Sequence, residues 1–162
     1  MSNLRLYTFT NFMLNTISQG IQPGHVGIDL AVKYRNSNEY TSRGEADLFW
    51  EWAKNHKTLI SLNGGNHAGV LEKYELLQKL SKETSFPMPF CAFYEDQETL
   101  GGLLTSVGVI LGEEVYDAVP QQDGSFVYTN VSDDGALTVK TYTSDTSDWK
   151  VIAMVKVCPL AR

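Results

Sequence analysis

Three hydrogen-bonding side chains follow the first apolar run of the chain and could form a site. Gln22, His25 and Asp29 are spaced so that they would share one face of a helix. Pro23 is typical of a first helical turn, where its missing N–H is no loss, so the pattern places this face near a helix N-terminus. The alternative is that these residues only cap the helix or are polar residues whose hydrogen bonds are satisfied within the fold.

A glycine-rich loop is a second candidate site, because it lies between a predicted strand and a helical pattern. Such a loop leaves backbone N–H groups pointing outward at a helix start, where they can bind an anion. The candidate binding residues are Asn63, Gly64, Gly65 and Asn66. The loop lacks the Lys-Ser/Thr of a P-loop and the spacing of a dinucleotide fingerprint, so a tight connection is the alternative.

The charge distribution limits nucleic-acid binding to one part of the chain. The net charge is −6, with 13 basic and 19 acidic residues, which argues against a broad surface for nucleic acid. Basic residues are relatively frequent only in the first third, where they could contact phosphate or could simply be solvated helix ends. They are Lys33, Arg35, Arg43, Lys54 and Lys57.

Length and composition indicate one globular domain of 162 residues without a membrane span. The first ten residues alternate like a strand, so we expect no secretion signal. Cys91 and Cys158 lie far apart, and the histidines lack metal-ligand spacing. We therefore expect a cytoplasmic protein with reduced thiols, no metal site, no cofactor and no membrane partner.

Hydrophobic periodicity predicts an α/β fold for residues 1–119. The predicted order is strand, helix, helix, strand, helix, strand, strand, helix, which favours a mixed four-stranded sheet in a three-layer-like arrangement. The predicted strands are 4–9, 57–62, 90–94 and 103–111, and the predicted helices are 23–34, 44–56, 70–80 and 113–119. Residues 11–20 are interpreted as a loop. Strand 103–111 is apolar on both faces, which indicates an interior strand with Thr105 and Val107 on the same side.

The last 43 residues, 120–162, are predicted to form a separate β extension. Asp-Gly pairs, which favour hairpin turns, separate three strand-like segments in an antiparallel meander. These segments are 126–131, 137–142 and 149–157. A free edge in the last segment could pair with another subunit, so a homo-oligomer through the C-terminal strands is a further hypothesis.

The order of elements and the Gln22-Pro23-Gly24-His25 sequence resemble the archaeal and eukaryotic type of peptidyl-tRNA hydrolase. That family has Gln-x-x-His in its first helix and an Asp-containing loop before a strand similar to Thr105–Leu111. Asp96 stands in the region of that loop. The family's lysines near the first strand and its Asp-Ala-Gly-Arg-Thr motif are missing here. The resemblance covers about three quarters of the chain, in topology more than in motif.

The resemblance implies hydrolysis of the ester that joins a peptide, or an N-blocked amino acid, to tRNA. It implies that Asp96 orients water or the ribose, that Thr105 donates to the ester carbonyl, and that Gln22 positions one of them. His25 could act as a base near neutral pH, and a helix N-terminus would keep it neutral. The alternative is structural: Thr105 satisfies a strand edge and Asp96 starts a turn.

A second hypothesis is a non-catalytic protein that uses the same fold to hold a protein, a nucleotide or tRNA. The acidic composition, the missing lysines and the added strands favour this hypothesis. An inhibitor, for example one carried by a virus, would belong to this class.

Overall fold

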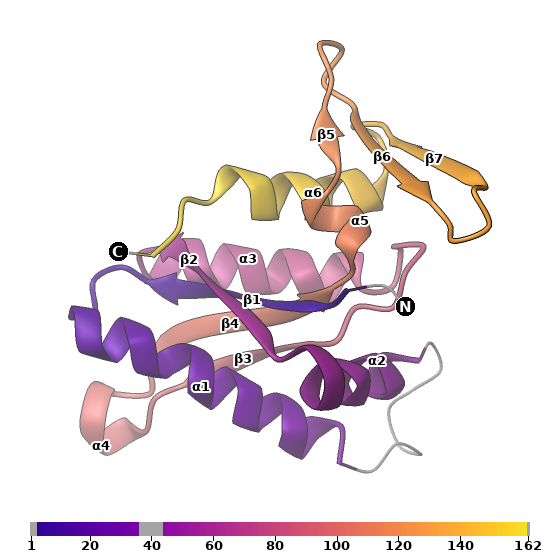
Figure 1. Cartoon of the computed structure of the whole chain (residues 1–162). Helices are drawn as coiled ribbons and strands as arrows, with labels where there is room; N and C mark the ends of the chain where they lie inside the picture. The colour runs from indigo at the N-terminus through magenta and orange to yellow at the C-terminus, as the bar shows by residue number, and fades with distance from the viewer. Residues whose placement is uncertain (1–2, 36–43, 162) are drawn as a thin grey trace.

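The structure is a computed structural model that describes residues 3–35 and 44–161. Its central sheet has the strand order β2-β1-β4-β3 (Figure 1). The strands are β1 (Arg5–Asn11), β2 (Thr58–Gly65), β3 (Phe90–Tyr94) and β4 (Leu104–Leu111). β1 runs parallel to β2 and antiparallel to β4, and β3 is antiparallel to β4. All residues of β4 are buried, which confirms the predicted interior strand in a mixed sheet.

Helices cover both faces of this sheet (Figure 1). The helices are α1 (Thr16–Lys33), α2 (Glu45–Glu51), the π-helical segment η1 (Trp52–His56), α3 (His67–Leu80), α4 (Gln97–Leu100), α5 (Glu113–Tyr116) and α6 (Ser147–Val157). Leu6 and Val26 belong to the hydrophobic core between the sheet and α1, α2 and η1. Phe9 and Leu77 belong to the core on the other face, beneath α3 and α6. The predicted α/β fold with helical layers around a four-stranded sheet is confirmed.

α1 begins earlier than the sequence pattern predicted. Residues 16–20, interpreted as loop, form its first turns, because Asn15 caps the helix by accepting a hydrogen bond from the Ser18 N–H. Pro23 therefore lies inside the helix rather than in its first turn. As a consequence, Gln22 and His25 lie in the middle of α1 and not at its N-terminus.

The C-terminal region contains a separate antiparallel sheet and one helix. The sheet has the order β5-β6-β7, formed by β5 (Val119–Pro120), β6 (Phe126–Val131) and β7 (Leu137–Tyr142). The predicted pairing of residues 126–131 with 137–142 is confirmed. The predicted third strand, 149–157, is wrong, because this segment is helix α6.

Helix α6 forms despite its strand-like composition. The Thr146 hydroxyl accepts a hydrogen bond from the Trp149 N–H, and this cap starts the helix. Val151, Ile152 and Val155 are buried on one side of it, against the core beneath α3. Tertiary packing and capping therefore override the β preference of these branched side chains.

Within residues 3–35 and 44–161, no helix is both long and apolar enough to span a membrane.

Candidate functional site

The centre of the candidate site is the side-chain amide of Gln22, which α1 places over the sheet. Gln22 is 3% exposed, and Thr105 on β4 is fully buried beneath it. The Thr105 hydroxyl donates a hydrogen bond of 3.0 Å to Oε1 of Gln22. The amide Nε2 donates a hydrogen bond of 2.7 Å to Oε1 of Glu95, which directly follows β3. We refer to Gln22, Thr105 and Glu95 as the Gln22 cluster.

An irregularity in the sheet directs Thr105 toward α1. The β3–β4 pairing shifts register between Phe93 and Tyr94, opposite Thr105, which is thereby the extra residue of a β-bulge. Strict alternation along β4 would have placed Thr105 with Val107, which packs in the core beneath α3. The prediction that these two residues share one side is therefore wrong, and the bulge is what allows Thr105 to meet Gln22.

Further polar groups lie in the sheet beneath α1. Thr10 and Ser106 are directly paired in the β1–β4 ladder, and their buried hydroxyl oxygens are 3.1 Å apart. The hydroxyl of Thr8 is fully enclosed, with no hydrogen-bond partner among the described residues. Small hydroxyl side chains therefore extend from the Gln22 cluster along β1 and β4.

His25 lies one turn beyond Gln22 and packs against an aromatic ring. Its imidazole centroid is 4.5 Å from that of Phe93, and its Nδ1 is buried without a hydrogen-bond partner among the described residues. The predicted influence of a helix N-terminus on His25 is wrong, because the residue lies in the interior of α1. Burial raises the pKa of Asp29, one further turn along, and the charge of His25 opposes that shift.

Asp96 is the N-cap of α4, the short helix that follows β3. Its carboxylate accepts a hydrogen bond from the Thr99 N–H. Hydrogen bonding to the side chain of Thr99, and then to its backbone, lowers the pKa of Asp96. The carboxylate that Gln22 contacts is that of the preceding residue, Glu95. The structure therefore brings Gln22 and Thr105 together, and the carboxylate beside Gln22 is that of Glu95 and not that of Asp96.

The sequence offered one signal for Glu95. It is an acidic residue directly after a strand, in the same acidic run as Asp96, and strand ends commonly carry ligand-binding side chains. The choice between two adjacent acidic residues depends on the backbone direction at the end of β3, which residue types alone do not determine.

The glycine-rich loop is closed by its own side chains. Asn63 accepts a hydrogen bond from the Gly65 N–H, and Asn66 accepts one from the Gly69 N–H as the N-cap of α3. A Cβ atom on Gly64 would lie 2.8 Å from the backbone of Phe9, so this glycine permits close contact between β2 and β1. The N–H of Gly65, one of the candidate binding residues, and that of Gly69 in the first turn of α3 are therefore already used in hydrogen bonds within this segment.

The basic side chains of the first third have different environments. The ammonium of Lys33 donates a hydrogen bond of 2.6 Å to the Phe90 carbonyl, and burial lowers the pKa of Lys33. Its charge is therefore engaged with β3 instead of facing phosphate. Arg35 is exposed at the end of α1, whereas Arg43 lies outside the described residues. Lys54 and Lys57 are exposed around the end of η1.

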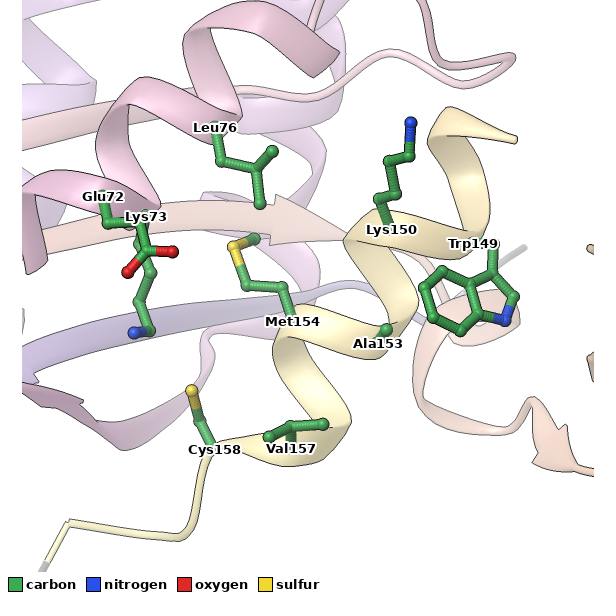
Figure 2. A pocket seen from close by; sticks show the side chains of 9 residues that line it. All are labelled: Glu72, Lys73, Leu76, Trp149, Lys150, Ala153, Met154, Val157 and Cys158. Atoms are coloured by element: carbon green, nitrogen blue, oxygen red, sulfur yellow. The ribbon is translucent and has the colours of Figure 1, made fainter. Parts of the chain in front are cut away.

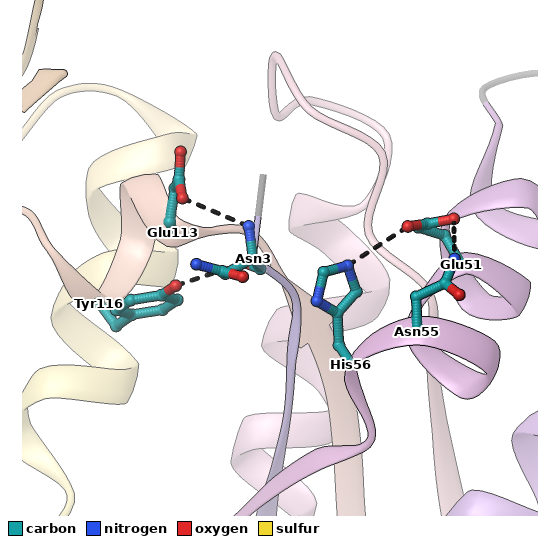
Figure 3. Close-up of polar contacts among 6 residues, drawn as sticks. All are labelled: Asn3, Glu51, Asn55, His56, Glu113 and Tyr116. Atoms are coloured by element: carbon teal, nitrogen blue, oxygen red, sulfur yellow. Dashed lines mark hydrogen bonds and ion pairs between the residues drawn. The ribbon is translucent and has the colours of Figure 1, made fainter. Parts of the chain in front are cut away.

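The remaining histidines show no metal-binding arrangement. His56 pairs with Glu51 at 3.3 Å, and Asn55 donates to the second oxygen of the same carboxylate (Figure 3). Figure 3 also shows a separate set of contacts, in which Asn3 forms hydrogen bonds with Glu113 and Tyr116 of α5. Among the described residues, no group of three or more His, Cys, Asp or Glu side chains is arranged to hold a metal ion.

Neither a known family model nor a curated protein matches this sequence.

Proposed function

We propose that this protein is a divergent hydrolase of the peptidyl-tRNA hydrolase type, acting on the ester between a peptide, or an N-blocked amino acid, and tRNA. The observation that carries the proposal is the bridge that Gln22 makes between Thr105 and Glu95. Gln22 and Thr105 are among the residues that the resemblance implies. Glu95 supplies a carboxylate that can act as the base in ester hydrolysis. A cytoplasmic location would give the protein access to this substrate.

Glu95 is the residue assigned to water activation. A partly exposed carboxylate can take a proton from a water molecule, and the resulting hydroxide attacks the ester carbonyl. The ester bond then breaks as the proton held by Glu95 passes to the leaving ribose oxygen, which gives a ribose hydroxyl on tRNA, a carboxylic acid on the peptide that ionises in water, and Glu95 again as a carboxylate. Gln22 is a positioning residue in this scheme, because its amide holds one oxygen of Glu95 and leaves the other for water.

Thr105 also acts through Gln22. Its hydroxyl hydrogen is directed at Gln22 Oε1, so the amide presents its N–H side to Glu95. This role differs from the donation to the ester carbonyl that the resemblance implies. A substrate that displaced Gln22 would be needed before Thr105 could donate to an ester.

The test is hydrolysis of N-acetyl-aminoacyl-tRNA by the purified protein, measured as release of the N-acetyl amino acid. Glu95→Gln should lower the rate by about 10²–10⁴-fold, the usual effect of removing a general base. The variant keeps an oxygen that can accept from Gln22, so the fold is retained. Asp96→Asn tests the other carboxylate and should have the smaller effect, and Glu98→Gln on exposed α4 is the matched control.

A non-catalytic binding protein with the same fold is the second candidate. It is favoured by the burial of Gln22 and Thr105, which restricts access of a bulky ester to the cluster. Its occupant would be a protein, a nucleotide or tRNA. Association through the C-terminal strands would be a self-binding form of it, but only β5, β6 and β7 could take part, because segment 149–157 is helix α6 and offers no strand edge. Absence of turnover, or turnover that is unchanged by Glu95→Gln, Asp96→Asn and Gln22→Ala, would support this candidate and exclude the hydrolase.

A further inference from the structure

A groove with a volume of about 360 Å³ lies between α3 and α6, on the face of the sheet opposite α1 (Figure 2). Its floor consists of Leu76 from α3 and of Ala153 and Met154 from α6, all of them partly buried against the core. The indole of Trp149 also lines the groove (Figure 2). Small-molecule sites in proteins are commonly apolar concavities of this order of size, with a few polar groups that orient the ligand.

Two lysines give this apolar groove a positive character. Figure 2 shows Lys73 and Lys150 at opposite ends, with Leu76 and Met154 between them. Glu72 is the acidic residue of the lining, so the groove carries an excess of positive charge in a protein whose net charge is −6. This local charge is opposite to that of the molecule as a whole.

The ammonium of Lys73 is held in place by the backbone. It donates to the carbonyl oxygens of Gly64 and Gly69 at 3.1 and 3.3 Å, which leaves the third N–H of the ammonium for another acceptor. Its positive charge also opposes the rise that burial causes in the pKa of Cys158, which lines the same groove. One of the two cations is therefore fixed before any ligand binds.

We propose that the groove between α3 and α6 binds a small organic anion with an apolar body, such as a medium-chain carboxylate. The carboxylate lies beside Lys150, and the hydrocarbon chain covers Ala153 and Met154. Lys73 provides the second positive charge at the far end. A cationic amphiphile would meet two lysines against the one carboxylate of Glu72, and a neutral one would gain only the apolar contact. This site is independent of the Gln22 cluster and of the proposed hydrolysis.

The experiment compares three ligands of equal chain length on the full chain by isothermal titration calorimetry. Decanoate, decanol and decyltrimethylammonium are each used below the concentration at which they self-associate. We expect decanoate to bind about tenfold more tightly than the other two, since about 1.4 kcal/mol of charge interaction corresponds to that ratio. Bound decanoate should also slow alkylation of Cys158, which lines the groove.

Variants separate the charge from the apolar contact. Lys150→Glu should weaken decanoate binding by about tenfold and strengthen binding of the cation, whereas Lys79→Glu, on an exposed part of α3, should change neither. Ala153→Trp should fill the groove and abolish binding of all three, with circular dichroism confirming the fold. Equal affinities for the three ligands, no binding of decanoate, or decanoate binding that survives both Lys150→Glu and Ala153→Trp would overturn the proposal.

Discussion

The amide of Gln22 is oriented by partners on two different strands. Its oxygen accepts from Thr105 on β4, and its nitrogen donates to Glu95 at the end of β3. Because the amide is buried, rotation by half a turn would bring its N–H₂ group against Thr105 and its oxygen against a carboxylate. The two contacts therefore determine one orientation, and this orientation presents Glu95 with a fixed hydrogen-bond donor.

Thr105→Val should destabilise the protein, because it keeps the shape of the side chain but leaves Oε1 of Gln22 buried without its donor. The expected loss of unfolding free energy is about 1–3 kcal/mol. Urea unfolding monitored by circular dichroism measures this loss. Thr138→Val, at an exposed position of β7, is the matched control and should change stability by less than about 0.5 kcal/mol. Equal effects of the two substitutions would show that the Gln22 contact is dispensable for stability.

The thiol of Cys91 should make stability depend on pH in the alkaline range. Burial raises its pKa from 9.0 to about 12, and Asp29 adds to the rise. Above pH 9 the unfolded chain therefore releases a proton that the folded protein retains, so unfolding is favoured as pH increases. Between the two pKa values, one such group lowers the unfolding free energy by about 1.4 kcal/mol for each unit by which the pH rises.

Urea unfolding at several values between pH 8 and 9 tests this dependence, because a tyrosine with the ordinary pKa of about 10 is at most about one-tenth ionised there. Cys91→Ala should flatten the fall in stability, whatever its effect on stability at pH 8. Cys158→Ala should flatten it less, since the thiol of Cys158 is only partly buried. A slope in Cys91→Ala equal to that of the wild-type protein would contradict the assignment.

Among the helices and strands, the sequence predicted the elements that follow from hydrophobic periodicity. It missed the features that depend on capping, burial and strand pairing. The alternation in β1 and the two-sided apolar pattern of β4 predict these two strands, and the order of elements along the chain favours the mixed sheet in which they pair. The start of α1 depends on the Asn15 cap, a local signal that the periodicity of apolar residues does not carry. Helix α6 depends on the burial of Ile152 in the core, which local preferences do not encode. The bulge at Thr105 arises from pairing with β3, so alternation alone placed that residue on the wrong face.

The distance between α1 and the sheet is set by a glycine on β4. A Cβ atom on Gly108 would overlap Cγ1 of Val26, a fully buried residue of α1. Gly108→Ala should therefore push α1 outward and destabilise the protein by about 1–3 kcal/mol, as overpacked cores do. It should also lengthen or break the contacts of the Gln22 cluster.

Gly24→Ala is the matched control, because nothing lies within 4 Å of a Cβ atom at this position of α1. Alanine is the better helix former, so this variant should gain about 0.5–1 kcal/mol. Thermal unfolding should thus move the midpoint in opposite directions for the two variants. A Gly108→Ala protein as stable as the wild type would mean that α1 does not rest directly on β4.

At the scale of the whole molecule, the core beneath α3 combines both parts of the chain. Phe9 of β1 and Leu77 of α3 belong to the same cluster of buried side chains as Tyr128 of β6 and Ile152 of α6. The C-terminal region therefore contributes to the core that supports β1 and β4, the strands beneath the Gln22 cluster. Loss of packing in α6 should consequently also destabilise β1 and β4, which lie beneath the Gln22 cluster on the opposite face of the sheet.

Ile152→Ala tests this coupling, because Ile152 is fully buried. Removing its buried methyl groups should lower the unfolding free energy by about 2–5 kcal/mol. Native-state hydrogen exchange should show the same reduction in the free energy of opening for the amides of β1 and of β6, because the shared core makes the two strands unfold together. Val157→Ala, on the same helix but with Val157 80% exposed, should leave both sets unchanged. If Ile152→Ala weakens protection in β6 alone, residues 120–162 unfold as a separate unit, and the core beneath α3 does not transmit stability to the candidate site.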